Sequence, residues 1–199
     1  MLILSRQERR VYLRRLLPYI TGSLVLFALG ILIGLIVVQR VPGARDNFAD
    51  TLADFTRMFT KMPPWKLAGA IFLNNSLKTL AAVVLGAVLG IVPGIFLLAN
   101  GAALAVAVTW SIQTRGLSHS LMSILPHGIL ELPAVFLATS VGLLLGIHVL
   151  KRLRGQTAAP IKDELVCGLK FYFTLVLPVL LIAALVEAFI TAALVMPRS

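Results

Sequence analysis

The sequence is poor in the residues that soluble enzymes depend on. It has a single cysteine, Cys167, so no internal disulfide can form, and it has neither a C-x-x-C pair nor a zinc-ligand spacing. Only 13% of its residues are charged, about half the share of a soluble domain, whereas 59% are hydrophobic. These proportions exclude an ordinary soluble protein and predict an integral membrane protein.

Acidic residues are also scarce. Against 18 lysines and arginines the chain has 8 aspartates and glutamates, which gives a formal net charge of +10. So basic a chain suggests nucleic-acid binding, but apolar runs separate the basic clusters along this sequence. We therefore expect anionic lipid headgroups of the bilayer, and no nucleic acid, as the partners of these residues.

Two basic clusters predict the orientation of the chain. Five arginines lie in residues 1–15 and five lysines and arginines in residues 151–170, and both segments fall on one side of the membrane if there are five spans. The positive-inside rule then places the N-terminus in the cytoplasm and the C-terminus outside, in a multi-pass protein of the cell membrane. The start of the chain lacks the order of a cleaved signal peptide, so we expect the first span to be retained.

Long apolar runs predict an all-α, polytopic fold with one integral membrane domain over residues 1–199. A run of about 20 apolar residues crosses the hydrocarbon core as a helix. The predicted spans are 16–39, 69–99, 102–118, 129–150 and 171–196. In residues 40–68, apolar side chains recur at spacings of four and three, which predicts an amphipathic helix at the extracytoplasmic surface.

Two of the predicted boundaries depend on breaks inside apolar runs. Residues 67–113 are long enough for two spans that turn either at residues 92–94 or at Asn100-Gly101. We favour Asn100-Gly101, because Asn-Gly is a strong turn signal and membrane helices tolerate a proline kink. Residues 121–150 would extend about 45 Å as one helix, longer than the hydrocarbon core. Pro126 and Gly128 therefore predict a broken or re-entrant helix over residues 119–128.

Glycines four residues apart recur in three of the runs. Such spacing lets helix backbones approach closely in lipid, either within one bundle or between chains. The glycines predicted to pack helices are Gly30, Gly34, Gly86, Gly90, Gly94, Gly142 and Gly146. Their faces also predict a homo-oligomer as one form of assembly.

Three short motifs resemble those of a known family. The chain has Asn74-Asn75, then Asn100-Gly101, then Pro126-His127-Gly128-Ile129-Leu130-Glu131-Leu132-Pro133-Ala134. This order is similar to that of the stage II sporulation protein M family of membrane proteins, over roughly residues 67–190. Pro-His-Gly-x-x-Glu is the specific element of the resemblance. In spore formers the resemblance implies a scaffold for peptidoglycan-degrading enzymes during engulfment, and it implies the fold more firmly than the biological role.

A few polar residues remain inside the apolar runs, where a charge is costly and by default marks a functional site. The residues singled out are Asn74, Asn75, Lys78, Asn100, His127, Glu131 and Glu187. On the five-span interpretation Lys78, Glu131 and Glu187 all lie in the outer half of the membrane, so Lys78 is placed to bridge one or both carboxylates. His127 and Glu131 share a helical face if the helix continues through the motif, and we expect both to face the interior of the bundle.

Structural and functional interpretations of these residues remain open. A buried Lys–Glu pair and interhelical asparagine hydrogen bonds would hold the bundle in register, whereas a broken helix with polar groups at mid-membrane is also a transporter device. An intramembrane hydrolase is disfavoured because the chain has no H-E-x-x-H motif. His127 and Glu131 offer only two ligands, too few for a structural zinc site.

We therefore expect a protein that is not an enzyme and that has no cofactor and no metal. The preferred function is a membrane scaffold or organiser of an envelope-associated complex, with membrane or envelope proteins as partners. The alternative is a channel or secondary transporter that uses Lys78, His127, Glu131 and Glu187. A scaffold needs an exposed partner surface, whereas a transporter needs a continuous polar path.

Overall fold

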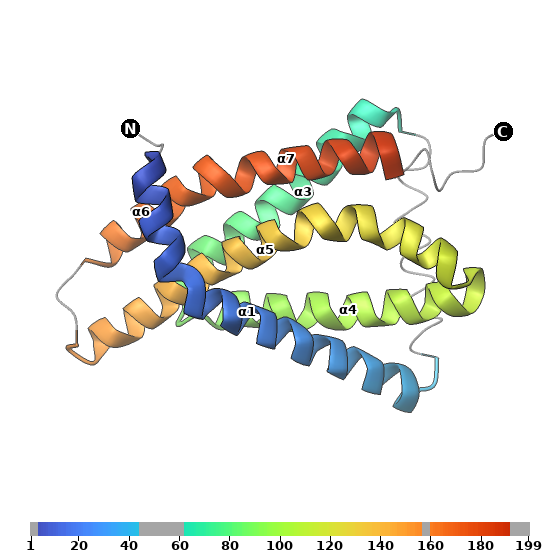
Figure 1. Cartoon of the computed structure of the whole chain (residues 1–199). Coiled ribbons are helices and arrows are strands. Elements are labelled where there is room, and N and C mark those ends of the chain that lie inside the picture. The colour runs from blue at the N-terminus through green and yellow to red at the C-terminus, as the bar shows by residue number, and fades with distance from the viewer. Residues whose placement is uncertain (1–3, 44–61, 157–159, 192–199) are drawn as a thin grey trace.

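The computed structural model describes residues 4–43, 62–156 and 160–191, without the side chains of residues 119, 123–127, 190 and 191. Within these residues every regular element is helical, which confirms the all-α prediction (Figure 1). The helices are α1 (Arg6–Arg40), α3 (Pro64–Val84), α4 (Ile91–Arg115), α5 (Leu117–Leu153), α6 (Ile161–Phe171) and α7 (Leu177–Val186). The short turns are η1 (Leu85–Ala87), η2 (Tyr172–Val176) and η3 (Glu187–Thr191). Among the described residues, five helices are long and apolar enough to cross a membrane, so the chain is a multi-pass membrane protein.

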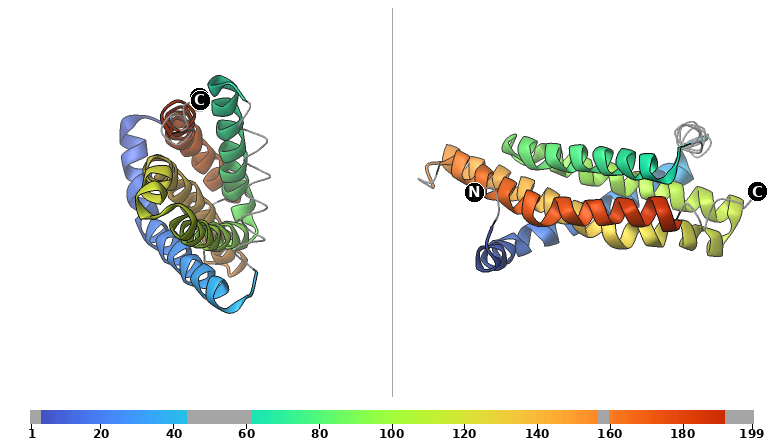
Figure 2. Two further views of the ribbon diagram at one scale, coloured as in Figure 1. Left: turned by 90° about the vertical axis from the view of Figure 1, so that its right-hand side faces the viewer. Right: turned by 90° about the horizontal axis from the view of Figure 1, so that it is seen from above.

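Helix α5 forms the centre of the bundle. It packs against α1, α3, α4 and α7, and the view from one end shows it between them (Figure 2). Of the apolar window of its span, 56% is buried, against 22–33% for the other four spans. Helices α6 and α7 continue through the π-helical turn η2 as one rod along this core. Helix α5 thus contacts each of these four helices, while α1 and α4 also pack extensively on each other.

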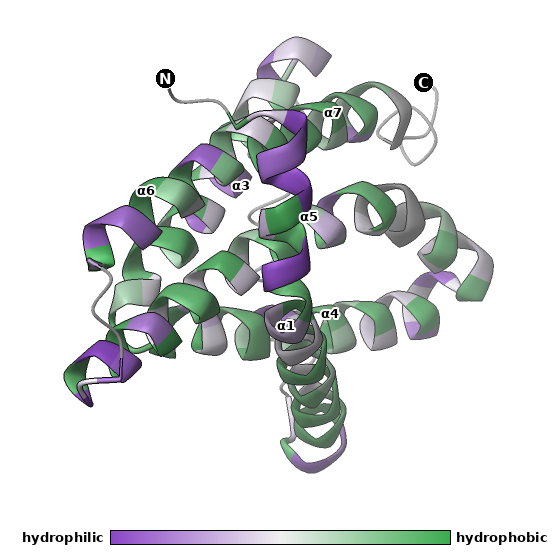
Figure 3. Ribbon diagram, turned by 60° about the vertical axis from the view of Figure 1, so that its left-hand side comes forward, coloured by the Kyte–Doolittle hydropathy of each residue, from purple (hydrophilic) through white to green (hydrophobic). Residues whose placement is uncertain are grey.

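The two basic clusters of the sequence lie at one end of the bundle. The first turns of α1, the start of α6 and the end of α5 lie at one end and are hydrophilic, whereas the helices between the ends are mostly hydrophobic (Figure 3). This arrangement brings the arginines of residues 6–15 and the basic residues around 151–162 to the same end of the molecule. The described chain thus has the same-side placement of the two basic clusters that the five-span interpretation requires.

The turn between the second and third spans lies at residues 85–90, and the predicted turn at Asn100-Gly101 is wrong. Leu89 and Gly90 have φ angles of 53° and 74°, which reverse the chain direction. Asn100 and Gly101 lie inside α4, where the Asn100 side chain donates a hydrogen bond to the Phe96 carbonyl at 2.7 Å. Pro93 falls in the first turn of α4, where a missing N–H leaves no helix bond unmade. The second span is accordingly Pro64–Ala87 and the third is Ile91–Arg115.

The break predicted at residues 119–128 is also wrong. The backbone of α5 is helical from Leu117 to Leu153, a length of about 55 Å, and Figure 1 shows the helix bending along its course. The true reversal is tighter and earlier, because Gly116 alone connects α4 to α5 with a φ of 82°. Membrane helices keep proline where neighbouring helices support the freed backbone groups, so Pro126 does not end the helix.

The predicted amphipathic helix in residues 40–68 lies largely outside the described residues, which resume at Met62. Its expected stop is present, since Pro63 precedes α3 and Pro64 occupies the first helical position. Trp65 is 65% exposed in that first turn, as expected of a residue at the membrane surface. The α3 helix therefore begins about five residues before the predicted span.

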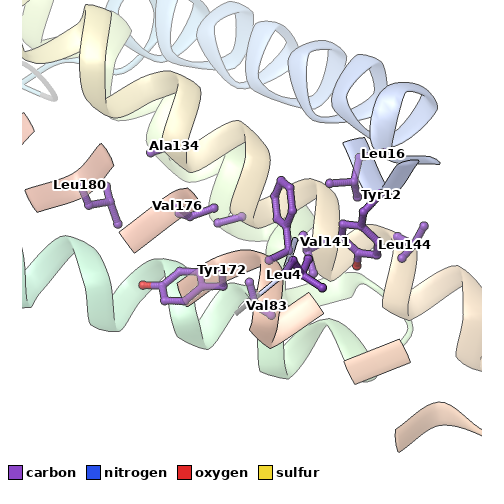
Figure 4. Packing of buried hydrophobic residues seen from close by; sticks show 12 residues of the cluster. Leu4, Tyr12, Leu16, Val83, Ala134, Val141, Leu144, Tyr172, Val176 and Leu180 are labelled. Atoms are coloured by element: carbon purple, nitrogen blue, oxygen red, sulfur yellow. The ribbon is translucent and has the colours of Figure 1, made fainter. Parts of the chain in front are cut away.

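The larger hydrophobic core lies toward the basic end of the bundle. There Tyr12 and Leu16 of α1 meet Val141 and Leu144 of α5, while Tyr172 reaches toward α3 (Figure 4). A smaller cluster around Phe27, Leu97 and Val135 joins α1, α4 and α5 nearer the middle. These two clusters fix the positions of the polar side chains along the bundle.

Candidate functional site: polar groups and helix contacts in the bundle

The contact between α1 and α4 depends on glycine. A Cβ on Gly30 would lie 2.9 Å from the Cα of Leu98, and a Cβ on Gly34 would lie 2.5 Å from the carbonyl oxygen of Ala102. Gly101, from the predicted turn, instead packs on the backbone of α1 at residues 27–31. The two backbones therefore touch along parallel helices, as small residues allow in lipid.

Glycines also fix the turn after α3 against α5. A Cβ on Gly86 would lie 2.7 Å from the carbonyl carbon of Gly142, and one on Gly146 would lie 2.5 Å from the Cα of Gly90. Six of the seven predicted packing glycines thus make their contacts inside the chain and are buried. Gly94 is the exception, because a Cβ there would meet nothing within 4 Å. The six buried glycines are used within one chain, and a homo-oligomer through such faces stays a prediction.

Hydroxyl groups bridge the helices at two places within the spans. Ser23 of α1 and Ser140 of α5 lie 3.2 Å apart at their Oγ atoms, and Thr139 donates to Ser23 at the same distance. All three residues are fully buried, and Thr139 and Ser140 also donate to helix carbonyls one turn earlier. Each of these three buried hydroxyls therefore has a partner, which is the condition for burying such a group in lipid.

A second set of hydrogen-bonded hydroxyls joins α3 to η2. The Tyr172 hydroxyl donates to the Ser76 carbonyl at 2.7 Å and lies 3.1 Å from the Thr79 hydroxyl. Thr79 in turn donates to the Asn75 carbonyl at 2.6 Å. These residues could not be identified from the sequence, because single hydroxyls in an apolar run carry no pattern that sets them apart.

A buried acidic residue at the basic end ties three helices together. Glu164 of α6 has a side chain that is 7% exposed, and its Oε2 accepts a hydrogen bond from the Arg15 guanidinium at 2.5 Å. Tyr12 donates to Oε1 at 3.4 Å, and Nδ1 of His148 on α5 lies 3.9 Å from Oε2. The sequence did not reveal this site because Glu164 falls in a polar loop segment, where an acid is expected to be solvated. The useful signal is that Glu164 is one of only two acids in residues 151–170.

Two shallow hollows flank this ion pair. One, of about 250 Å³, lies between α1 and α5 and is lined by Arg15, Tyr19, His148 and Lys151 among others. The second lies on the other side of Arg15, beside Glu8, Tyr12 and Cys167. No three His, Cys, Asp or Glu side chains lie together as metal ligands would in the parts of the chain that the structure describes. The local chemistry is that of charge pairing at a membrane surface.

The predicted bridge from Lys78 to the intramembrane carboxylates is not present. Lys78 and Asn74 are exposed on α3, and Lys78 makes no ion pair with any described part of the chain. Asn74 donates to the Asn75 side chain at 3.1 Å. A lysine at the centre of a lone membrane helix costs about 2.5–3.5 kcal/mol, so an outward-facing Lys78 needs a physical reason.

The remaining predicted residues lie on α4, α5 and η3. Asn100 is exposed on α4 and uses its amide within its own helix. His127 lies in the helical backbone of α5, and its side chain is outside the described set. Glu131 is half-buried with its Oε2 atom buried, and Glu187 is half-buried in the first position of η3. Lys78, Asn74 and Asn100 therefore do not join Glu131 and Glu187 in one polar centre.

Comparison with known proteins identifies one family. The family model described as stage II sporulation protein M matches residues 23–192. No curated protein and no solved structure matches the chain.

Proposed function

Because the chain belongs to the stage II sporulation protein M family, we propose that it is a non-enzymatic membrane protein that holds partners of an envelope-associated complex together. The family match covers all five membrane-spanning helices in part or whole. In the membrane, this bundle would present fixed surfaces to other proteins.

The observation that carries this proposal is the direct backbone contact at the helix glycines. At Gly30 and Gly34 of α1, and at Gly86 and Gly146 around the α3–α4 turn, a single methyl group would overlap backbone atoms of the facing helix. Interfaces closed in this way resist the rocking of one half against another that alternating access uses. A rigid bundle suits a platform for other proteins better than a carrier.

The distribution of polar groups supports the same proposal. The buried hydroxyls of Ser23, Thr139 and Ser140 bond to one another and to carbonyls, and Lys78 faces outward. A transporter needs polar groups that follow one another along a path between the two surfaces. The second candidate function is a channel or transporter. The observation that favours it is the buried carboxylate oxygen of Glu131 inside a span.

Ion flux through the purified protein separates these two functions. Full-length protein in liposomes, monitored with pH-sensitive and sodium-sensitive dyes, is expected to give no flux above that of empty liposomes. Glu131→Gln is expected to lower the thermal unfolding temperature without affecting flux, because it weakens the interaction that this half-buried carboxylate makes. Flux in the wild type that Glu131→Gln abolishes at unchanged unfolding temperature would instead establish transport.

Orientation is part of the proposal, and cysteine labelling tests it. Ser5 and Gln156 lie at the basic end of the bundle, so single cysteines at these positions in a Cys167→Ser background are expected to react together. The positive-inside rule places them in the cytoplasm, where a membrane-impermeant maleimide labels them only after the cells are permeabilised. Labelling of one position in intact cells and of the other only after permeabilisation would contradict the five-span arrangement.

A further inference from the structure

The outward face of α3 carries a charge, Lys78, well inside a membrane span. Lys78 and Asn74 lie one helical turn apart on this face, next to Leu73 and Leu77, which are 58% and 57% exposed. By contrast, the exposed face of α1 in its span carries residues such as Leu32 and Ile36. Lys78 makes neither a hydrogen bond nor an ion pair with the residues that the structure describes.

The depth of Lys78 places this charge near the middle of the membrane. Lys78 follows Pro64 by fourteen residues, about 21 Å of helix. In the other direction Gly86 lies eight residues on, about 12 Å, and packs at the level of Gly142 on α5. Lys151, the first basic residue of α5 beyond that point, is a further nine residues away, about 13 Å. Lys78 is therefore well inside its span in both directions, about 12 Å of helix from Gly86 and about 21 Å from Pro64.

A lysine at this depth cannot reach water along its own side chain. Snorkelling carries an ammonium group to the interface only from positions near a helix end, and four methylene groups cover a small part of either distance. An ammonium group that faces hydrocarbon is costly unless a carboxylate or other acceptor meets it there. The described part of the chain thus supplies no acceptor for Lys78 on the exposed face of α3.

We propose that this face of α3 binds a transmembrane helix of a different protein that carries an aspartate or glutamate at mid-membrane depth. The carboxylate accepts hydrogen bonds from Lys78, and Asn74 supplies a second polar group one turn away. The inference rests on the proposed scaffold function, since it names the chemistry by which the scaffold recognises one partner. Polar groups of this kind are common interhelical contacts in membranes.

Among the residues that the structure describes, a second copy of the chain does not provide that carboxylate. A two-fold axis along α3 would place Lys78 beside the Lys78 of the other copy, with like charges in a medium of low dielectric. Glu131 has its Oε2 atom buried within the bundle. Glu187 lies fifteen residues beyond Tyr172, whose hydroxyl meets Thr79, and so about 22 Å of helix away from the level of Lys78.

Designed transmembrane peptides test the proposal, because they can present a single carboxylate on an otherwise apolar helix. The full-length protein carries a donor fluorophore on an introduced N-terminal cysteine, in the Cys167→Ser background. It is placed in lipid nanodiscs together with a polyleucine helix that carries the acceptor fluorophore. The helix has one central glutamate, or glutamine in its place, and association is read by energy transfer. We expect roughly tenfold tighter association with the glutamate helix, the scale of one good interhelical polar contact.

The variants assign that preference to Lys78. Lys78→Met is expected to abolish the preference and Lys78→Arg to keep it, with thermal unfolding confirming that both fold. Lys66→Met is the matched control on the same helix, because Lys66 lies over the Trp65 ring in the first turn, and it should leave the preference unchanged. Equal binding of the two peptides, or an equal preference in Lys78→Met, would overturn the inference.

Self-association gives an independent check. If energy transfer between two labelled copies of the chain is strong and is lost in Lys78→Met, the occupant of this face is a second copy and the inference is wrong. These results do not decide the scaffold function itself, which the flux measurements address separately.

Discussion

Gly146→Ala is expected to lower the free energy of unfolding by about 3 kcal/mol, although it adds one methyl group. A Cβ at this position would lie 2.5 Å from the Cα of Gly90 and 2.6 Å from the carbonyl carbon of Leu89. Both are backbone atoms of the α3–α4 turn, and Gly90 is held there with a φ of 74°. Overpacking of this kind costs about 1–3 kcal/mol and sometimes more, and here no flexible side chain can move aside. The helix cannot accept the methyl group without separating from the turn.

Gly94→Ala provides the matched control. Gly94 lies in α4, where an added methyl group would have nothing within 4 Å, and alanine is the better helix former by about 1 kcal/mol. This variant is expected to keep or slightly raise the thermal unfolding temperature in detergent, while Gly146→Ala lowers it by many degrees. Equal unfolding temperatures for the two variants would show that the α5 contact with the turn does not exist.

The same two glycines show how far the sequence could predict this fold. Apolar length predicted the five spans, because the cost of unmade backbone hydrogen bonds in lipid leaves little choice but helix. Glycine spacing predicted close packing, and it did so correctly at Gly146 and wrongly at Gly94. The spacing is identical in both cases, so only the position of the facing helix distinguishes them.

The misplaced turn has a related cause. Asn100-Gly101 is a strong turn signal in water, but here the asparagine bonds within its own helix and the glycine is needed for contact with α1. The actual turn at residues 85–90 has no asparagine, aspartate or serine. Because both stretches contain glycine, the choice between them depends on which register packs α4 on α1. That information lies in tertiary contacts rather than in the local sequence.

The candidate polar residues also include some that the sequence identified correctly and some that it did not. Lys78 was recognised from its depth in an apolar run, but depth along a helix does not say which face the residue occupies. Its predicted pairing with Glu131 or Glu187 required an inward face, whereas the structure turns it outward. Glu164 illustrates the converse, since the sequence placed it in a solvated loop and the packing of α6 on α1 and α5 buries it.

The buried ion pair of Glu164 predicts an unequal response to the loss of its two members. Arg15→Met is expected to lower the free energy of unfolding by about 3 kcal/mol, because it leaves a buried carboxylate without its charged partner. Glu164→Gln is expected to cost only about 1 kcal/mol, since half of the Arg15 side chain is exposed and its guanidinium remains hydrated. The single amide oxygen of the glutamine can still accept a hydrogen bond from Arg15 or from Tyr12.

A double-mutant cycle then tests whether these residues act as a pair. The Arg15→Met/Glu164→Gln variant is expected to be more stable than Arg15→Met alone, because removing the second charge relieves the first loss. Arg14→Met is the control, since Arg14 is the exposed neighbour of Arg15 and its loss should change stability by no more than about 0.5 kcal/mol. Strictly additive losses, or a greater loss from Glu164→Gln than from Arg15→Met, would contradict the buried pair. Arg15→Met lowers stability more than Glu164→Gln only if the carboxylate, and not the guanidinium, is the buried member of the pair. This arrangement fastens α6 to α1 at the basic end.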